Sequence, residues 1–138
     1  MLVGTEWAGS PSNYPQGVIV IKNASHDFVM EAFGRCLFSV VPSLWPEPFG
    51  QVAVEAMAVK RPVIASAHGG LTDIVLDQET GLLVEPGDAP ALHAAMLRLL
   101  EDEALCDRFG SAGYARARQR FTRTRVTDQI EAIFQSAV

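Results

Sequence analysis

The chain has 138 residues, of which 49% are hydrophobic, and its formal net charge is −5. This is the length of one ordinary domain with enough apolar residues for a core, and the acidic balance argues against a nucleic-acid-binding surface over the whole chain. The longest apolar runs fall far short of the roughly 20 residues that a transmembrane helix needs, so we expect no transmembrane segment.

The N-terminus and the cysteines indicate a cytoplasmic protein. The apolar residues 1–4 are followed at once by Glu6 and a loop rich in Gly, Ser and Pro, which does not match a signal peptide. Cys36 and Cys106 are widely spaced and lack a metal-type pairing. We therefore expect two free thiols in a reducing cytoplasm.

The first half of the chain alternates short apolar runs with helical patterns. Residues 1–3 end a strand, and residues 5–16 form an irregular loop. The β-branched run 18–21 predicts a strand covered on both faces. Ser25 can cap a helix over residues 26–34. Further elements are a strand at 37–41, a proline-rich loop at 42–50 and a helix at 52–59.

The second half continues the alternation. Strands are predicted at residues 62–65 and 81–84, with a small-residue loop at 66–70 and a short helix at 71–76 between them. A helix over 91–101 follows the N-cap residue Asp88. Residues 103–120 predict either one helix or two helices separated by a break near Gly110 or Gly113. The inward face of a closing helix over 124–135 is expected to carry Val126, Ile130, Ile133 and Phe134.

This order of elements predicts an α/β fold: a Rossmann-like parallel sheet with helices on both faces. Ligands of such sheets bind outside the carboxyl ends of the strands. We therefore expect the loops that leave those ends to face one crevice. They are residues 5–16, 22–25, 42–50 and 66–70.

Two glutamates stand out near that crevice. Glu55 lies in the middle of an otherwise apolar helical pattern, and Glu47 lies in the loop before it. A buried carboxylate is costly without a partner, whereas carboxylates accept hydrogen bonds well from the vicinal hydroxyls of a sugar or ribose. Gln51 lies one helical turn before Glu55 and can orient it.

Two glycine-containing loops predict phosphate sites. Gly50 opens one helix and the pair Gly69-Gly70 opens another. Glycine lets the backbone approach a ligand closely, and a helix N-terminus offers free N–H groups and partial positive charge. The residues thus indicate a nucleotide with an attached sugar, its phosphates at helix ends and its hydroxyls on Glu47 and Glu55.

Several ordered blocks closely resemble the C-terminal, donor-binding domain of retaining glycosyltransferases of the GT-B fold, family 4 or group 1. The family signature is two glutamates eight positions apart, here Glu47 and Glu55. The matching blocks are EPFG at 47–50, EAMA at 55–58, PVIA at 62–65, the pair Gly69-Gly70, and TGLLVEPGD at 80–88.

The resemblance implies roles for individual residues. Glu47, at the catalytic position, would contact the hydroxyls of the donor sugar, and Glu55 would hold the ribose. The base would lie against residues Ile21, Lys22 and Asn23. The sugar and diphosphate would be lined by Glu47, Pro48, Phe49, Gly50, Gln51, Val52, Gly69 and Gly70. The family transfers a sugar from a nucleotide diphosphate sugar with retention of configuration, and it generally needs no metal or other cofactor.

The resemblance also implies that something is missing. The family usually has glycine at the position of Lys60 and near that of Lys22, and often glutamate at that of Asp73. Its C-terminal domain normally begins with a further strand–helix unit and follows an N-terminal acceptor domain. We therefore expect residues 1–138 to be one nucleotide-sugar-binding domain, truncated at its N-terminus and inactive in transfer without the acceptor domain.

Plainer interpretations stand beside these. Glu47 is then a solvated carboxylate, Glu55 pairs with Lys60 or Arg61, and Gly69-Gly70 is an ordinary turn. His68 is a solvated loop residue and His26 a surface or helix-end residue. The arginines of the C-terminal helices then form a solvated face. They are Arg116, Arg118, Arg120, Arg123 and Arg125.

Two other functions stay open. A catalytically inactive fragment can self-associate through an exposed sheet edge, by edge pairing or swapping, to give a homodimer. A sugar-phosphate epimerase is the third hypothesis, although its chemistry needs carboxylates and histidine from two domains.

Overall fold

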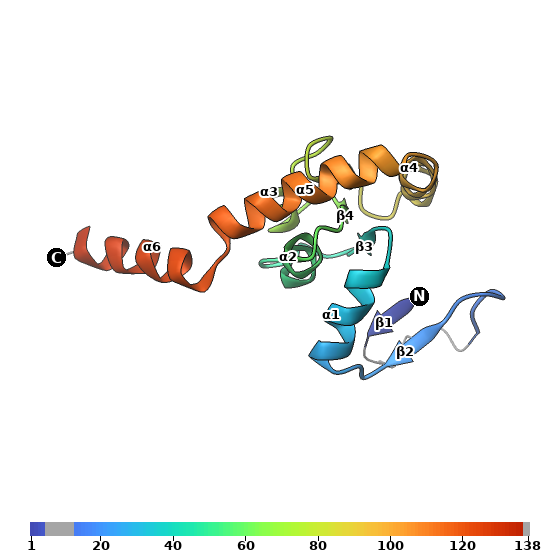
Figure 1. Cartoon of the computed structure of the whole chain (residues 1–138), viewed down its shortest axis with the longest axis horizontal. Helices are drawn as coiled ribbons and strands as arrows, with labels where there is room; N and C mark the ends of the chain where they lie inside the picture. Colours follow the sequence, from blue (N-terminus) through green and yellow to red (C-terminus); the bar gives the residue numbers. More distant parts are fainter. Residues whose placement is uncertain (5–12, 137–138) are drawn as a thin grey trace.

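The computed structural model describes residues 1–4 and 13–136, so most of the predicted loop 5–16 lies outside the described residues. Figure 1 shows strands and helices alternating along the first two-thirds of the chain, followed by helices alone. The strands are β1 (Leu2–Gly4), β2 (Val20–Lys22), β3 (Ser39–Val41), β4 (Val63–Ser66) and β5 (Gly81–Val84). The helices are α1 (His26–Arg35), α2 (Gln51–Ala58), α3 (Leu71–Ile74), α4 (Ala89–Glu101), α5 (Glu103–Arg120) and α6 (Arg123–Ser136).

All pairings between these strands are parallel. Strands β3, β4 and β5 form one sheet in that order, with Val40 opposite Ile64 and Ile64 opposite Leu82. Strands β1 and β2 form a separate two-stranded sheet, which lies beside α1 in Figure 1. The predicted α/β class, with a parallel sheet between helices, is confirmed.

The prediction of a strand at 18–21 covered on both faces is wrong. The strand is β2, two residues later, and Val18 and Ile19 before it are 37% and 60% exposed. Strand β2 pairs only with β1 among the described residues, so it lacks the flanking strands and helix layers that bury a central strand.

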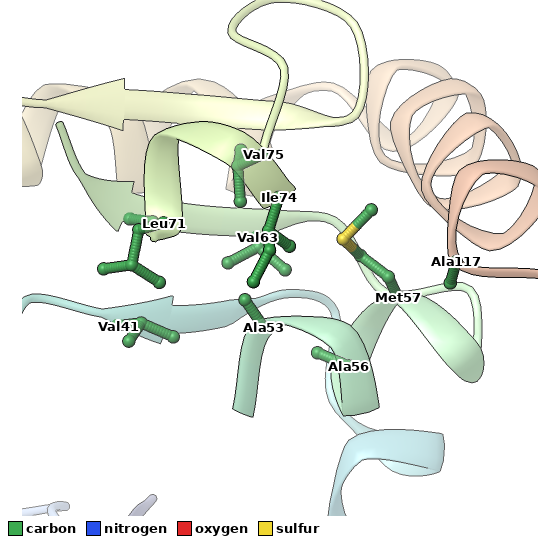
Figure 2. Packing of buried hydrophobic residues seen from close by; sticks show 10 residues of the cluster. Val41, Ala53, Ala56, Met57, Val63, Leu71, Ile74, Val75 and Ala117 are labelled. Carbon is green, nitrogen blue, oxygen red and sulfur yellow. The ribbon is translucent and has the colours of Figure 1, made fainter. Parts of the chain in front are cut away.

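Strand β4 is the centre of the core, because all four of its residues are buried. Val63 and Ala65 face a cluster with α2 and α3, whereas Ile64 faces a second cluster with α4 and α5. Figure 2 shows the first cluster, in which α2 residues meet the strands and α3. This two-sided burial accounts for the continuous apolar run that marks β4 in the sequence.

Helix α5 is continuous, so of the two alternatives for residues 103–120 the single helix is confirmed and the break near Gly110 or Gly113 does not occur. A Cβ atom on Gly110 would lie 2.2 Å from the Lys60 carbonyl oxygen, and one on Gly113 would lie 3.2 Å from Met57 Cγ. Both glycines therefore serve close packing of α5 on the end of α2. Lys60 there adopts the left-handed conformation (φ 61°), where the family usually has glycine.

The prediction that α6 turns its apolar residues inward is also wrong. Val126 and Ile130 are 41% and 49% exposed, and Phe134 is 70% exposed. Figure 1 shows α6 projecting away from the rest of the chain beyond α5. Helical periodicity defines an apolar face but not what covers it, and no described element lies over this one.

Both cysteines are free, as predicted, with Cys106 buried and Cys36 half-buried. Burial raises the pKa of both thiols, because it disfavours the thiolate form. Within residues 1–4 and 13–136, every helix is too short or too polar to cross a membrane.

Candidate functional site

The loop after β3 leads into α2 through Gly50. Gly50 is buried with a φ of 102°, a conformation that other residues rarely adopt, and a Cβ atom there would lie 2.7 Å from Leu71 Cδ2. Helix α2 begins at Gln51, and its N-cap makes no side-chain hydrogen bond. Its first N–H groups thus have no capping side chain, which is the arrangement of an anion-binding helix N-terminus.

Glu47 is held in place by its own loop. The Ser43 hydroxyl donates a hydrogen bond of 2.6 Å to Glu47 Oε1, and Ser43 is buried. His68 Nε2 lies 3.1 Å from the Ser43 carbonyl oxygen. His68 therefore bonds the loop before Glu47 and is not a freely solvated histidine. Glu47 is half-buried.

The pair Gly69-Gly70 lies directly against this loop. The Gly70 N–H donates to the Glu47 carbonyl oxygen at 2.7 Å. A Cβ atom on Gly70 would lie 2.4 Å from the Phe49 carbonyl oxygen, and one on Gly69 would lie 2.7 Å from the Glu47 nitrogen. The two glycines thus allow the backbone of loop 66–70 to contact the backbone of loop 42–50. Helix α3 after them spans only Leu71–Ile74, so its dipole is short.

Glu55 has the partner that the sequence predicts. Gln51 Nε2 donates to Glu55 Oε1 at 2.9 Å, and the carboxylate side chain is 17% exposed. The alternative pairing with Lys60 or Arg61 is wrong. The Lys60 ammonium lies over the Tyr114 ring, and Arg61 donates to carbonyls at the end of α1.

The start of α1 also reaches this glutamate. His26 Nδ1 lies 3.7 Å from Glu55 Oε1, on an imidazole that is 66% exposed. Ser25 caps the helix through Phe28 N–H, as predicted. His26 is thus a site neighbour that sequence reasoning placed on the surface. The contact between His26 and Glu55 joins residues that are 29 positions apart in the chain, so a local sequence pattern cannot predict it.

The predicted base-binding residues lie at the end of β2. Ile21 is half-buried and Lys22 is the last strand residue, with Asn23 after it in the left-handed conformation (φ 53°). The contact between His26 and Glu55 connects the segment after β2 to helix α2.

Sequence reasoning also missed two residues near the end of α5. Arg116 contacts α3, and Phe121 contacts Phe49.

A groove of about 220 Å³ marks the same edge of the sheet. It is lined mainly by apolar side chains where β3, β4 and β5 end, among them Pro42, Leu44, Val84 and Leu92. The loops 42–50 and 66–70 therefore meet at the carboxyl ends of the strands, as the fold rule predicts. Loop 22–25 joins them through α1.

Comparison with known proteins identifies the family. The sequence profile of the family "Glycosyl transferases group 1" matches residues 12–116. The chain belongs to this family. Among relatives of this group 1 chain, an uncharacterized glycosyltransferase of Methanocaldococcus jannaschii is 44% identical over 89 residues, which are 64% of this chain and 25% of the relative.

Solved glycosyltransferase structures share the fold. Sucrose-phosphate synthase from Thermosynechococcus elongatus superposes with a TM-score of 0.79 at 39% identity, over 86% of this chain and 30% of that one. Anabaena HepE in complex with UDP-glucose has a TM-score of 0.78 at 29% identity, over 85% and 32% of the two chains. The group 1 chain thus has the fold of a GT-B donor domain and spans about a third or less of these proteins.

Proposed function

We propose that this chain is the donor-binding domain of a retaining glycosyltransferase that transfers a hexose from a nucleotide diphosphate sugar. The observation that carries the proposal is the start of α2. Glu47 and Glu55 lie on either side of an uncapped helix N-terminus, and each carboxylate is oriented by a neighbouring donor. Hydroxyl-binding groups thus flank an anion-binding group, which suits a sugar and a ribose joined by a diphosphate.

In this proposal the two carboxylates have different tasks. Glu55, fixed by Gln51 and near His26, accepts hydrogen bonds from the ribose hydroxyls. Glu47, fixed by Ser43, accepts them from the donor sugar next to the reacting carbon. The N–H groups at the start of α2 hold the diphosphate between them. The UDP and UDP-glucose bound by Anabaena HepE support this class of ligand.

Calorimetric titration of UDP, GDP, ADP and a hexose conjugate of each tests the assignment. Glu55→Ala should weaken both free nucleotide and nucleotide sugar by about 1–3 kcal/mol, because hydrogen bonds to a charged group are lost. Glu47→Ala should weaken only the nucleotide sugar. Glu101→Ala, at the exposed end of α4, is the matched control and should change neither affinity.

Two results would contradict the proposal. The first is that none of the six ligands binds the wild-type chain at millimolar concentration. The second is that both glutamate variants lose the same affinity for free nucleotide and for nucleotide sugar, since the two carboxylates would then not divide the ligand between them.

The acceptor and the reaction belong to the whole protein. We propose that a second domain binds the acceptor and completes the active site. The chain spans about a third or less of the glycosyltransferases that it matches, and the residues of the candidate site are all assigned to the donor. A cytoplasmic location fits the two free thiols and a nucleotide-sugar donor.

A second candidate function is self-association through a sheet edge. The Ser39 N–H donates a hydrogen bond to the Pro62 carbonyl oxygen, on the side of β3 that faces β4. In a parallel pair, alternate residues of a strand turn their backbone groups toward the same neighbour. The N–H and C=O of Val40 therefore point away from β4. Within the described residues, β3 pairs with β4 alone and β1 pairs with β2 alone. Such open edges favour strand addition from a second copy.

A further inference from the structure

The end of helix α5 contacts loop 42–50 of the candidate site and helix α3, which follows loop 66–70. Phe121, directly after the helix, packs edge-on against Phe49 with ring centroids 5.9 Å apart at an angle of 76°. The Arg116 guanidinium lies 5.8 Å from the centre of the Phe121 ring. One cation and two rings thus connect α5 to the loop that carries Glu47.

Arg116 also closes helix α3. Its Nε donates to the Ile74 carbonyl oxygen at 2.9 Å, and its Nη2 donates to the Asp73 carbonyl oxygen. Carbonyls at a helix end lack partners within the helix, so this guanidinium satisfies two of them. Because α3 follows Gly70 directly, Arg116 fixes the segment whose N–H bonds the Glu47 carbonyl.

We propose that Arg116 and Phe121 form a latch: together they hold loops 42–50 and 66–70, the two site loops, in fixed positions relative to each other for binding of the donor sugar. Both are positioning residues, because they act through Phe49 and α3 and not on the ligand. The inference rests on the proposed function, since it assigns the latch to the sugar-binding side of that site. Phe49 is 48% exposed, and its ring packs against that of Phe121.

The latch should matter more for the sugar than for the nucleotide. Glu47 and Phe49 lie on the loop that Phe121 supports, whereas Glu55 lies on α2 and is held by Gln51. Loss of an edge-on aromatic pair corresponds to about a three- to tenfold change in an equilibrium constant. We expect that change in the affinity for the nucleotide sugar and little change for the free nucleotide.

The variants are Phe121→Ala and Arg116→Lys, with Phe121→Tyr as the conservative rescue. Lysine keeps the charge of arginine but cannot donate to two carbonyls with a planar fork. The matched control is Arg118→Ala. Arg118 lies on the same helix, and its guanidinium is also 5.8 Å from an aromatic ring, that of Tyr114. That ring touches neither site loop in the contacts described above.

Two measurements are made on each variant of the 138-residue chain. Calorimetry gives affinities for UDP, UDP-glucose, GDP, GDP-mannose, ADP and ADP-glucose, and amide hydrogen exchange reports the Gly70 N–H. We expect Phe121→Ala and Arg116→Lys to bind the nucleotide sugar about three- to tenfold more weakly relative to the free nucleotide. Exchange at Gly70 should accelerate in both. Phe121→Tyr and Arg118→Ala should behave as wild type.

An equal loss for free nucleotide and nucleotide sugar would overturn the latch, since that is the result of general destabilisation. Unchanged sugar affinity despite faster exchange would overturn it as well. If the wild-type chain binds no ligand, the proposed function fails, and hydrogen exchange still decides whether Arg116 and Phe121 hold the two loops together.

Discussion

At the scale of single residues, Ser43 decides where the Glu47 carboxylate lies. The serine is buried at the end of β3, its hydroxyl donates to Glu47, and its carbonyl is bonded by His68. A carboxylate on a loop of this kind would otherwise sample several rotamers. The short hydrogen bond selects one of them before any ligand arrives.

Ser43→Ala should therefore weaken binding of a nucleotide sugar by about 1–2 kcal/mol, because Glu47 loses the hydrogen bond from the Ser43 hydroxyl and must be ordered by the ligand. Calorimetry with the nucleotide sugar that the wild-type chain binds measures this. Ser43→Thr keeps the hydroxyl and serves as the control. An alanine variant with wild-type affinity would show that the serine does not orient Glu47.

The sequence predicted a contact within one helix better than contacts between separate elements. The predicted Gln51–Glu55 bond follows from helical geometry and is confirmed, whereas the proposed roles of Glu47 and Glu55 stay predictions. The contacts of His26 with Glu55 and of His68 with Ser43 join separate elements. Their residue types fit many roles, so only the folded arrangement reveals them.

At the scale of elements, two glycines of the chain have opposite roles. Gly70 permits contact between the loop before α3 and the loop before α2, because a Cβ atom would lie 2.4 Å from the Phe49 carbonyl oxygen. Gly34, in the last turn of α1, has open space around its Cβ position. Glycine is therefore required for steric reasons at position 70 but not at position 34.

We expect Gly70→Ala to lower the free energy of unfolding by about 2 kcal/mol or more, because backbone must move to admit the methyl group. Gly34→Ala should instead raise it by about 0.5–1 kcal/mol through the lower entropy of the unfolded chain. Urea denaturation followed by circular dichroism gives both values. Equal effects of the two substitutions would refute the close contact at Gly70.

The boundaries of the elements show where sequence patterns are weak. Strands β4 and β5 were predicted to within one residue, because they are buried runs ended by glycine or proline. Gly110 and Gly113 suggested a helix break, but α5 uses them for close packing. Glycine marks both a turn and a tight contact, and the difference depends on a neighbour that is distant in sequence.

At the scale of the whole molecule, the sheet edges that are unpaired within residues 1–4 and 13–136 predict association. The wild-type chain should form dimers at high protein concentration in sedimentation velocity experiments, through the outer edge of β3. Val40→Pro removes the outward N–H and should give monomers, while Val40→Thr should still dimerise. Circular dichroism checks that the proline variant is folded. A wild-type chain that stays monomeric at all concentrations would exclude this second candidate function.

For helix α6, the sequence predicted an apolar face correctly but its burial wrongly. Its apolar periodicity is real, yet Ile130 and Phe134 are exposed, because nothing in the described part of the chain covers that face. The pattern defines an apolar face but does not say what covers it. The alternation of strands and helices, by contrast, predicted the parallel order of β3, β4 and β5, because each strand in it packs against its neighbours along the chain.

The construction of loop 42–50 has a consequence for how this domain can diversify. Backbone groups of Ser43, Glu47 and Phe49, together with the Phe49 ring, make the contacts that hold the loop to its neighbours. The side chains of Leu44 and Trp45 project from it and are 69% and 62% exposed. Neither side chain takes part in those contacts, so both positions tolerate substitution. If the proposed function is right, preferences for different sugars can evolve there with little loss of stability.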